Sequence, residues 1–316
     1  MAKHKVFVDG HEGTTGLEIH ERLQKRDDVE ILTIGSEKRK DTAERSKFIN
    51  QADIVFLCLP DDAARESAAL ISNPATRVID ASTAHRVADG WAYGIPELSA
   101  EHRKAIETSK RVSNPGCYAT GFNMLVFPLV KEGFVPADYP VSCHAVTGYS
   151  GGGRKLIETF ESDRNREKLN SPCFYSLALQ HKHIPEMRKH SGLANNPIFT
   201  PIVSRYYRGM TVAVPLHPDL LGKKADASQI NAFYHDYYKG QKFVKVLPMN
   251  AQDEFEWGYM NAESCNFTNN IEILVFGDDK QILVASRLDN LGKGASGAAI
   301  QNMNVMLGLD ESCFLA

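Results

Sequence analysis

The sequence of 316 residues lacks the features of a membrane, secreted or nucleic-acid-binding protein. No stretch approaches the run of about 18–20 consecutive apolar residues that a membrane helix needs. The start runs from Met-Ala-Lys-His-Lys straight into an apolar strand, without the longer apolar region and small-residue cleavage site of a signal peptide. A formal net charge of −3 gives no reason to expect nucleic acid or an anionic membrane as a partner. We therefore expect a cytoplasmic protein.

Metal-binding and disulfide patterns are also missing. The six cysteines are scattered without Cys-x-x-Cys spacing, which predicts reduced thiols and neither a disulfide framework nor a zinc site. A His-x-His pair, His181 and His183, can bind metal, but no third ligand of clear spacing accompanies it, and we expect no metal. We find no internal repeat and no low-complexity segment.

The alternation of apolar and helical stretches predicts the fold. The length suggests two domains, because a single core stops growing at roughly 250–300 residues. In the first 115 residues, strands and helices alternate, which predicts an α/β, Rossmann-like, doubly wound parallel sheet. The expected strands are 5–9, 29–34, 53–59, 77–80 and 111–113, and the expected helices are 14–25, 41–50, 61–72 and 99–108.

The rest of the chain predicts an α+β domain with a mixed or antiparallel sheet. A helix at about 118–131 leads to a strand near 141–147 and then to the glycine-rich stretch 148–153, which we expect to be flexible. Further expected strands, with better alternation of apolar and polar residues, are 198–204, 210–216, 271–276 and 282–286. A helical pattern returns at 294–307.

Three glycines lie between the first strand and the first helix, in Gly10-His-Glu-Gly13-Thr-Thr-Gly16. Glycine permits a tight turn and lets the backbone approach a pyrophosphate, which the helix N-terminus then attracts. The spacing differs from the commoner Gly-x-Gly-x-x-Gly, and a plain strand–helix connection is the alternative. The position at the first turn favours dinucleotide binding by Gly10, Gly13, Thr14, Thr15 and Gly16.

The end of the second strand indicates which dinucleotide binds. Basic residues there suit the extra phosphate of NADP, whereas an acidic residue holds the ribose of NAD. Ser36, Arg39 and Lys40 could hold the phosphate, although Glu37 could instead take the ribose. A solvated basic loop is the other alternative. The sequence favours NADP.

Cys117 is the candidate nucleophile. Pro115 and Gly116 end the fifth strand in a sharp turn directly before an apolar helix. Cys117 would then lie at a helix N-terminus and at the carboxyl edge of a parallel sheet, where ligands bind. A helix N-terminus lowers the pKa of a thiol, and the thiolate is the reactive form. A buried structural cysteine is the alternative, which we expect for Cys58 inside its apolar strand.

A thiolate needs a proton-handling partner, and the His181–His183 pair can supply one. Pro185 disfavours helix at Ile184, so we expect the pair at a helix end or in a loop. We favour His183, next to the Pro-Glu turn, as the acid–base group, with His181 orienting substrate or packing. The roles could be exchanged, and Glu186 or a bound water is the next candidate.

Six motifs in order resemble those of N-acetyl-γ-glutamyl-phosphate reductases, arginine-pathway enzymes, in their shorter form. The broader superfamily includes aspartate-semialdehyde and glyceraldehyde-phosphate dehydrogenases. The motifs are Gly10-x-x-Gly-x-x-Gly16, Tyr93-Gly-Ile-Pro-Glu97, Asn114-Pro-Gly-Cys-Tyr118, Ser150-Gly-Gly-Gly-Arg154, His181-Lys-His-Ile-Pro-Glu186 and Asp289-Asn-Leu-Gly-Lys-Gly294. Two departures are Gly152, where alanine is frequent, and the unusual 80–86 loop, which puts detailed substrate contacts in doubt.

The resemblance implies the roles of further residues. Cys117 would be the nucleophile and a histidine of the pair the acid–base group, while Asn114 and Ser150 would contact substrate. The final helix, about 292–309, would pack on the nucleotide domain, with Asn290 and Gly294 near the nicotinamide. The implied domains are an NADP-binding domain, 1–115 with 292–316, and a catalytic and dimerisation domain, 116–291. The assembly would be a homodimer or homotetramer.

The resemblance and the residue types together predict an acyl-phosphate reductase. Cys117 would expel phosphate and form a thioester, which NADPH reduces to the semialdehyde. Arg154 and Arg208 could hold the carboxylate or phosphate of the substrate, although each could instead form a salt bridge. Rivals are reductases of aspartyl or carrier-linked aminoadipyl phosphate, and a non-catalytic NADP-sensing protein, which would need no thiol at this turn.

Overall fold

The structure is a computed structural model that describes residues 3–165 and 167–315. The chain divides into two compact units. Unit 1 comprises the residues up to Pro115 together with those from Ala295 onward, and unit 2 comprises Gly116–Gly294. Among the described residues, no helix is long and apolar enough to cross a membrane.

Unit 1 contains a parallel sheet, with the strand order β2-β1-β3-β4-β6-β5 within the described residues. This sheet confirms the predicted Rossmann-like fold. The short strand β5 at its edge was not expected from the sequence. The strands are β1 (His4–Asp9), β2 (Val29–Leu32), β3 (Ile54–Leu57), β4 (Arg77–Asp80), β5 (Ala92–Tyr93) and β6 (Arg111–Ser113).

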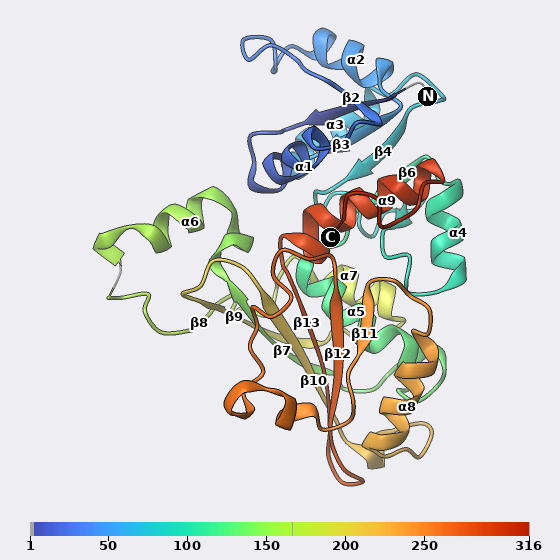
Figure 1. Cartoon of the computed structure of the whole chain (residues 1–316), viewed down its shortest axis with the longest axis vertical. Coiled ribbons are helices and arrows are strands. Elements are labelled where there is room, and N and C mark those ends of the chain that lie inside the picture. The colour runs from blue at the N-terminus through green and yellow to red at the C-terminus, as the bar shows by residue number, and fades with distance from the viewer. Residues whose placement is uncertain (1–2, 166, 316) are drawn as a thin grey trace. The chain divides into compact units, whose positions relative to one another are not determined.

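Helices pack on this sheet as its apolar pattern requires (Figure 1). Ile49 of α2 and Ala64 of α3 share one core cluster with Phe7 and Val55 of the sheet. Helix α9 contacts α1, α4 and β4. The helices are α1 (Thr14–Gln24), α2 (Thr42–Gln51), α3 (Asp61–Ala69), α4 (Ala100–Thr108) and α9 (Gly297–Leu307).

Strand β3 has no exposed face, since Ile54 to Leu57 are all fully buried, as its unbroken apolar run predicts. Cys58 was predicted to lie in the middle of this strand, which is wrong. It follows the last residue of β3, and its backbone N–H donates to the carbonyl of Asp9 at 2.8 Å, beside the glycine turn. The pairing of β3 with β1 ends one residue earlier because the turn at Gly10 begins there.

Unit 2 is built on a mixed sheet with the strand order β11-β12-β13-β10-β7-β9-β8 in its described part. The β7–β9 and β11–β12 pairs are parallel, and the other pairs are antiparallel. This confirms the predicted second sheet. The strands are β7 (Ser142–Gly148), β8 (Cys173–Phe174), β9 (Ile198–Ser204), β10 (Met210–Leu216), β11 (Val244–Val246), β12 (Ile271–Gly277) and β13 (Ile282–Leu288).

Helix α5 (Cys117–Lys131) carries the core of unit 2. It packs on β10 and β13, and residues 118–126 are all buried. Helix α8 (Ala227–Tyr237) packs on β12, and α7 (Ile184–Ser191) packs on α5. Neither α8 nor α6 (Gly153–Glu161) was expected from the sequence.

The glycine turn of unit 1 depends on the missing side chain of Gly10. Its φ is +90°, and an added Cβ would lie 2.8 Å from the carbonyl carbon of Cys58. Gly90 offers a matched control, since its φ is +79° and an added Cβ would meet nothing within 4 Å. Both replacements by alanine incur the backbone penalty of roughly 1–2 kcal/mol, and only the first adds a clash with backbone.

We therefore expect Gly10→Ala to lower Tm clearly more than Gly90→Ala, as measured by thermal unfolding of both variants beside the wild type. Equal Tm values for the two variants would contradict the close approach of Gly10 to Cys58.

Candidate active site

The glycine turn forms an anion-binding element at the start of α1. Gly13 is the N-cap of α1 and supplies no side-chain cap, so the first backbone N–H groups of the helix meet no side-chain acceptor from the cap. Thr14 and Thr15 form the first turn of the helix. An added Cβ at Gly16 would lie 3.0 Å from His11 Cα, so the turn closes tightly on itself. This backbone cradle fits the pyrophosphate of a dinucleotide.

The loop after β2 lies against the same turn. Arg39 forms an ion pair with Glu12 of the glycine turn, while the Ser36 hydroxyl is 3.5 Å from the Glu37 carboxylate. Lys40 is exposed. Arg39 and Ser36 therefore lie in one loop beside the cradle, where the ribose of a dinucleotide would be.

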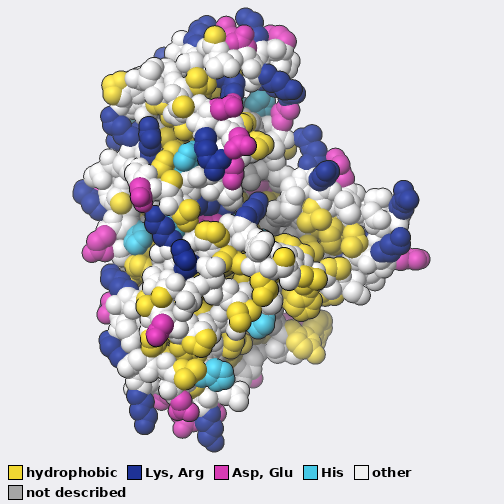
Figure 2. All heavy atoms as spheres, turned by 180° about the vertical axis from the view of Figure 1, so that it is seen from behind, with side chains coloured by type: hydrophobic (Ala, Val, Ile, Leu, Met, Phe, Trp, Pro, Cys, Tyr) yellow, Lys and Arg dark blue, Asp and Glu magenta, His cyan; other side chains and the backbone are white. Residues whose placement is uncertain are grey.

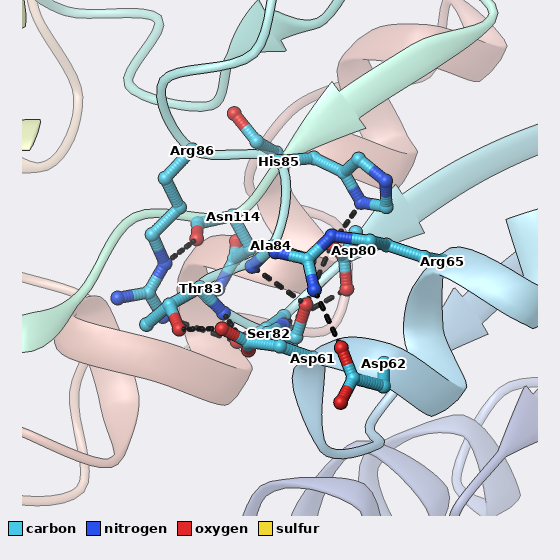
Figure 3. Close-up of polar contacts among 12 residues, drawn as sticks. Asp61, Asp62, Arg65, Asp80, Ser82, Thr83, Ala84, His85, Arg86 and Asn114 are labelled. Carbon is cyan, nitrogen blue, oxygen red and sulfur yellow. Dashed lines mark hydrogen bonds and ion pairs between the residues drawn. The ribbon is translucent and has the colours of Figure 1, made fainter. Parts of the chain in front are cut away.

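The unusual 80–86 loop forms a dense polar cluster at the carboxyl end of β4, as Figure 3 shows. The buried carboxylate of Asp80 accepts hydrogen bonds from the Ser82 hydroxyl at 2.8 Å and from the Ser82 backbone N–H at 2.9 Å. His85 Nδ1 lies 2.6 Å from Asp80 Oδ2. The Thr83 hydroxyl donates to Asp61 at 2.6 Å. The loop is therefore anchored by two carboxylates of unit 1.

This loop also holds Asn114, the expected substrate contact. Arg86 Nε donates to the Asn114 carbonyl at 3.0 Å, and the Asn114 backbone N–H donates to the Asp80 carbonyl at 2.7 Å. Asn114 Nδ2 donates to the Ala295 carbonyl, and its Oδ1 accepts from Asn302. Because its amide is 1% exposed and bonded at both ends, Asn114 fixes the chain three residues before Cys117.

Cys117 begins α5 in unit 2, directly after the N-cap Gly116, which provides no side-chain cap. The Gly116 N–H donates to Glu186 Oε2 at 3.1 Å. The other oxygen of this buried carboxylate lies 4.0 Å from His183 Nε2. Glu186 therefore connects the residue before the thiol to the histidine pair.

Both histidines pack around Tyr118, the neighbour of Cys117. The centroid of the His181 ring lies 5.6 Å from that of the Tyr118 ring, and the centroid of the His183 ring lies 5.8 Å from it. The two imidazoles are 4.7 Å apart and nearly perpendicular. The pair precedes α7, which starts at Ile184 with Pro185 in its first turn, where proline is tolerated. The predicted position at a helix end is confirmed.

The two histidines differ in their surroundings. His181 Nδ1 accepts a hydrogen bond from the His183 backbone N–H at 3.1 Å, so the neutral ring carries its proton on Nε2. Protonating Nδ1 as well would set two N–H groups against each other. His183 is 5% exposed, and its Nε2 lies beside the Glu186 carboxylate.

A tyrosine pair completes this part of unit 2. The Tyr175 hydroxyl donates to the Tyr118 hydroxyl at 2.8 Å. Burial raises the pKa of both phenols, and the nearby Cys117 thiol contributes to each shift. Both hydroxyls therefore stay protonated at neutral pH and can donate hydrogen bonds.

The remaining expected residues of unit 2 form a second group. Asn290 is 1% exposed, accepts from the Gly209 N–H at 2.8 Å and donates to the Ser150 hydroxyl at 3.0 Å. The stretch 148–153, expected to be flexible, instead forms a 3₁₀ turn (Tyr149–Gly152), with the Ser150 N–H bonded to the Tyr207 carbonyl. At the departure from the family pattern, Gly152, an added Cβ would lie 2.7 Å from Leu156 Cβ.

Gly294 and the two arginines lie in different settings. An added Cβ at Gly294 would be 2.7 Å from Cys117 Cβ, so this glycine packs directly on the thiol-bearing residue. Arg208 is 7% exposed and lies 3.3 Å from the buried Asp289 carboxylate. Arg154 is exposed near the start of α6. Within the described residues, no group of three His, Cys, Asp or Glu side chains could hold a metal ion.

The chain matches known proteins along nearly its whole length. Residues 5–106 match the family model "Semialdehyde dehydrogenase, NAD binding domain", and residues 117–290 match "Semialdehyde dehydrogenase, dimerisation domain". N-acetyl-gamma-glutamyl-phosphate reductase 2 of a Nostoc species is 46% identical over 98% of this chain and 99% of its own. The reductase of Mesorhizobium japonicum is 47% identical over 97% of this chain and 100% of its own.

The chain belongs to the N-acetyl-γ-glutamyl-phosphate reductase family.

Solved structures agree with this family at the level of the fold. Aspartate semialdehyde dehydrogenase II from Vibrio cholerae superposes with a TM-score of 0.72 at 16% identity, covering 97% of this chain and 99% of that chain. The aspartate semialdehyde dehydrogenase from Francisella tularensis gives 0.73 at 14% identity, covering 97% of this chain and 100% of that chain. At such low identity they show the fold alone.

Sequence reasoning gave no role to two residues that lie close to the reductase's cysteine. Tyr175 follows β8, in a stretch whose spacing carries no catalytic signal. Asp289 lies in a quoted motif, but its carboxylate partners come from segments that are distant in the sequence. Only the folded chain shows either connection.

The environments of the cysteines predict the order in which the thiols are alkylated, which can be tested without an activity assay. Burial raises the pKa of Cys58 and Cys143 well above that of an ordinary thiol, and raises the pKa of Cys265 to about 12. Their thiolate fractions at pH 8 are therefore very small, whereas Cys117 lies at a helix N-terminus. We expect iodoacetamide at pH 8 to label Cys117 first and to leave these three thiols unlabelled in the folded protein.

Peptide mapping by mass spectrometry at successive times measures this order. Labelling of Cys58 or Cys143 before Cys117 would contradict it. Unfolding in guanidinium is the control, because all six thiols then have similar access.

Proposed function

We propose that this protein reduces N-acetyl-γ-glutamyl phosphate to N-acetylglutamate semialdehyde with NADPH, releasing phosphate, in arginine biosynthesis. The observation that carries the proposal is Cys117 at the uncapped start of α5, with the histidine pair packed on the adjacent Tyr118. Nearly half of the residues are identical to those of relatives named for this activity. Reduction of aspartyl or carrier-linked aminoadipyl phosphate is the alternative.

The first step is attack of the Cys117 thiolate on the acyl carbon. The carbon–sulfur bond forms, the bond to the phosphate oxygen breaks, and phosphate leaves with the electron pair. The backbone N–H groups at the start of α5 favour negative charge on the sulfur and on the developing oxyanion. The protonated Tyr118 phenol, which accepts the Tyr175 proton, and the neutral His181 Nε2–H are further candidate donors.

The second step reduces the thioester, and bound NADPH supplies the hydride. His183 then protonates the oxygen of the hemithioacetal or takes its proton on collapse, which frees the thiolate and the aldehyde. The Glu186 carboxylate, 4.0 Å from His183 Nε2, can orient the imidazole for this work. His181 Nδ1 accepts the hydrogen bond from the His183 backbone N–H, so the proton of the neutral ring stays on Nε2, which acts as a fixed donor.

The glycine cradle fits NADP(H). Gly10 and Gly16 leave no room for a Cβ, which is the arrangement that lets backbone approach a pyrophosphate. Arg39 and Ser36, with Lys40 of the same loop, would hold the 2′-phosphate, and Arg39 would exchange Glu12 for that phosphate. Exposed Arg154 remains our candidate for the substrate's carboxylate or phosphate, and Ser150 lies four residues before it.

We propose a homodimer or homotetramer that joins through the outer face of the unit 2 sheet. Residues on this face alternate with the core residues, and the segment 247–260 packs against Ala213, Leu274 and Ala285. Ile198 on β9 is 56% exposed, and Leu283 on β13 is 37% exposed. Figure 2 shows hydrophobic side chains gathered beside the lobe that carries α6. The match to a dimerisation domain supports this assembly.

Phosphate-dependent reduction of NADP⁺ by the purified protein with N-acetylglutamate semialdehyde tests the function in the reverse direction. Aspartate semialdehyde serves as the matched control substrate.

We expect Cys117→Ser to abolish turnover and leave NADPH binding, measured by fluorescence, nearly intact. Turnover above about a tenth of wild type would exclude the covalent mechanism, since losing a nucleophile costs several orders of magnitude. Faster turnover of aspartate semialdehyde would favour the alternative.

The histidine roles form a separate prediction. We expect His183→Asn to lower turnover by about 10²–10⁴-fold, the usual contribution of general acid–base catalysis, and His181→Asn to lower it clearly less. Turnover at saturating NADPH and substrate from pH 6 to 9 measures both.

A larger loss in His181→Asn, with a changed pH profile, would exchange the two roles. Losses below tenfold in both variants would place the proton donor elsewhere.

A further inference from the structure

Asp289 is a buried carboxylate that the mechanism above does not use. It is 0% exposed and follows directly after β13. Its Oδ2 accepts from the Phe267 N–H at 2.8 Å and lies 3.3 Å from Arg208 Nη1, while its Oδ1 accepts from the Leu291 N–H at 2.9 Å. A buried carboxylate with this many partners is held in one orientation.

The same residue shapes the chain that follows it. The Gly294 N–H donates to the Asp289 carbonyl at 2.9 Å, which closes the Asp289–Gly294 turn. An added Cβ at Gly292 would lie 3.1 Å from Asp289 Cβ, so the turn is packed against its own first residue. The turn places Gly294 against Cys117, because a Cβ added at Gly294 would lie 2.7 Å from Cys117 Cβ.

Arg208 is engaged on the far side of this carboxylate. Its guanidinium lies over the Phe267 ring at 4.6 Å, and its carbonyl accepts from Asn266 Nδ2 at 3.0 Å. The side chain is therefore stacked and ion-paired within unit 2. Removing it would leave the Asp289 charge buried without its counter-ion, which is strongly destabilising.

We propose that Asp289, paired with Arg208, is a positioning residue for Cys117, and that Arg208 serves this pair and not the substrate's anion. The pair holds the Asp289–Gly294 turn, and the turn holds the cysteine through Gly294. The inference deepens the proposed function, because it assigns two residues to the same catalytic cysteine.

Alkylation of Cys117 in the free enzyme tests the proposal without substrate or cofactor. Loss of the Asp289 charge alone would favour the thiolate and speed alkylation, whereas loss of the turn should slow it. We expect Asp289→Ala to slow alkylation by iodoacetamide at pH 8 at least about threefold, since access and the helix terminus set the rate. Asp289→Asn keeps the shape and an acceptor and removes only the charge, so we expect it to react at the wild-type rate or faster.

Kinetics provide the second measurement, which rests on the proposed function. We expect Asp289→Ala to lower kcat at least about tenfold and leave both KM values nearly unchanged, because misplacing a reacting group by about 1 Å can cost 10²-fold. Arg208→Met should act in the same direction. If Arg208 bound the substrate, Arg208→Met would raise KM for the acyl phosphate or semialdehyde and leave alkylation unchanged, which would overturn the proposal.

Two further variants keep the test decisive. Glu272→Gln is the control, because it alters another carboxylate–arginine pair of the same sheet, with Arg287, and we expect unchanged alkylation. Gly294→Ala tests the contact itself and should slow alkylation even if Asp289→Ala fails to fold. Wild-type alkylation rates in both Asp289→Ala and Gly294→Ala would overturn the proposal, whereas absence of wild-type turnover would contradict only the proposed function.

Discussion

The site depends on one constraint, which is that a reactive thiol must lie at the start of a helix whose body is buried. The first backbone N–H groups of α5 have no acceptor within the helix, and Gly116 offers no side chain that would cap them. The helix cannot shift to suit a ligand, because its residues 118–126 are buried against the sheet of unit 2. The other residues of unit 2 that contact Cys117 therefore have to be positioned around the start of α5.

The chain meets that constraint with buried polar contacts from several segments. Glu186 accepts the Gly116 N–H and lies beside His183, so the same carboxylate contacts the backbone before the thiol and the candidate acid–base histidine. Gly294 touches Cys117 because the turn that begins at Asp289 ends there. Within unit 1, Asn114 is held by bonds at both ends of its amide. Burial makes each of these contacts costly to break, and none can be replaced by water without loss.

Much of this arrangement could be predicted because it is local in the sequence. The glycine turn, the Pro-Gly turn before Cys117 and the histidine pair before Pro185 each depend on the backbone preferences of a few neighbouring residues. The parallel sheet of unit 1 follows from alternating apolar and helical segments, and the resemblance adds roles to these positions. Cys58 was misplaced because an apolar run continues past the point where the glycine turn ends the strand pairing.

The sequence by itself determined the two sheets and the local turns that carry the candidate nucleophile, the candidate histidine pair and the cradle for the dinucleotide, because periodicity and turn chemistry act over a few residues. Only the tertiary structure decided how the polar side chains pair. It placed Arg208 on Asp289, bonded Asn290 to Ser150 and gave the two histidines different surroundings. No spacing in the sequence encodes these pairs, since each joins residues whose distance depends on how strands and turns pack around a shared core.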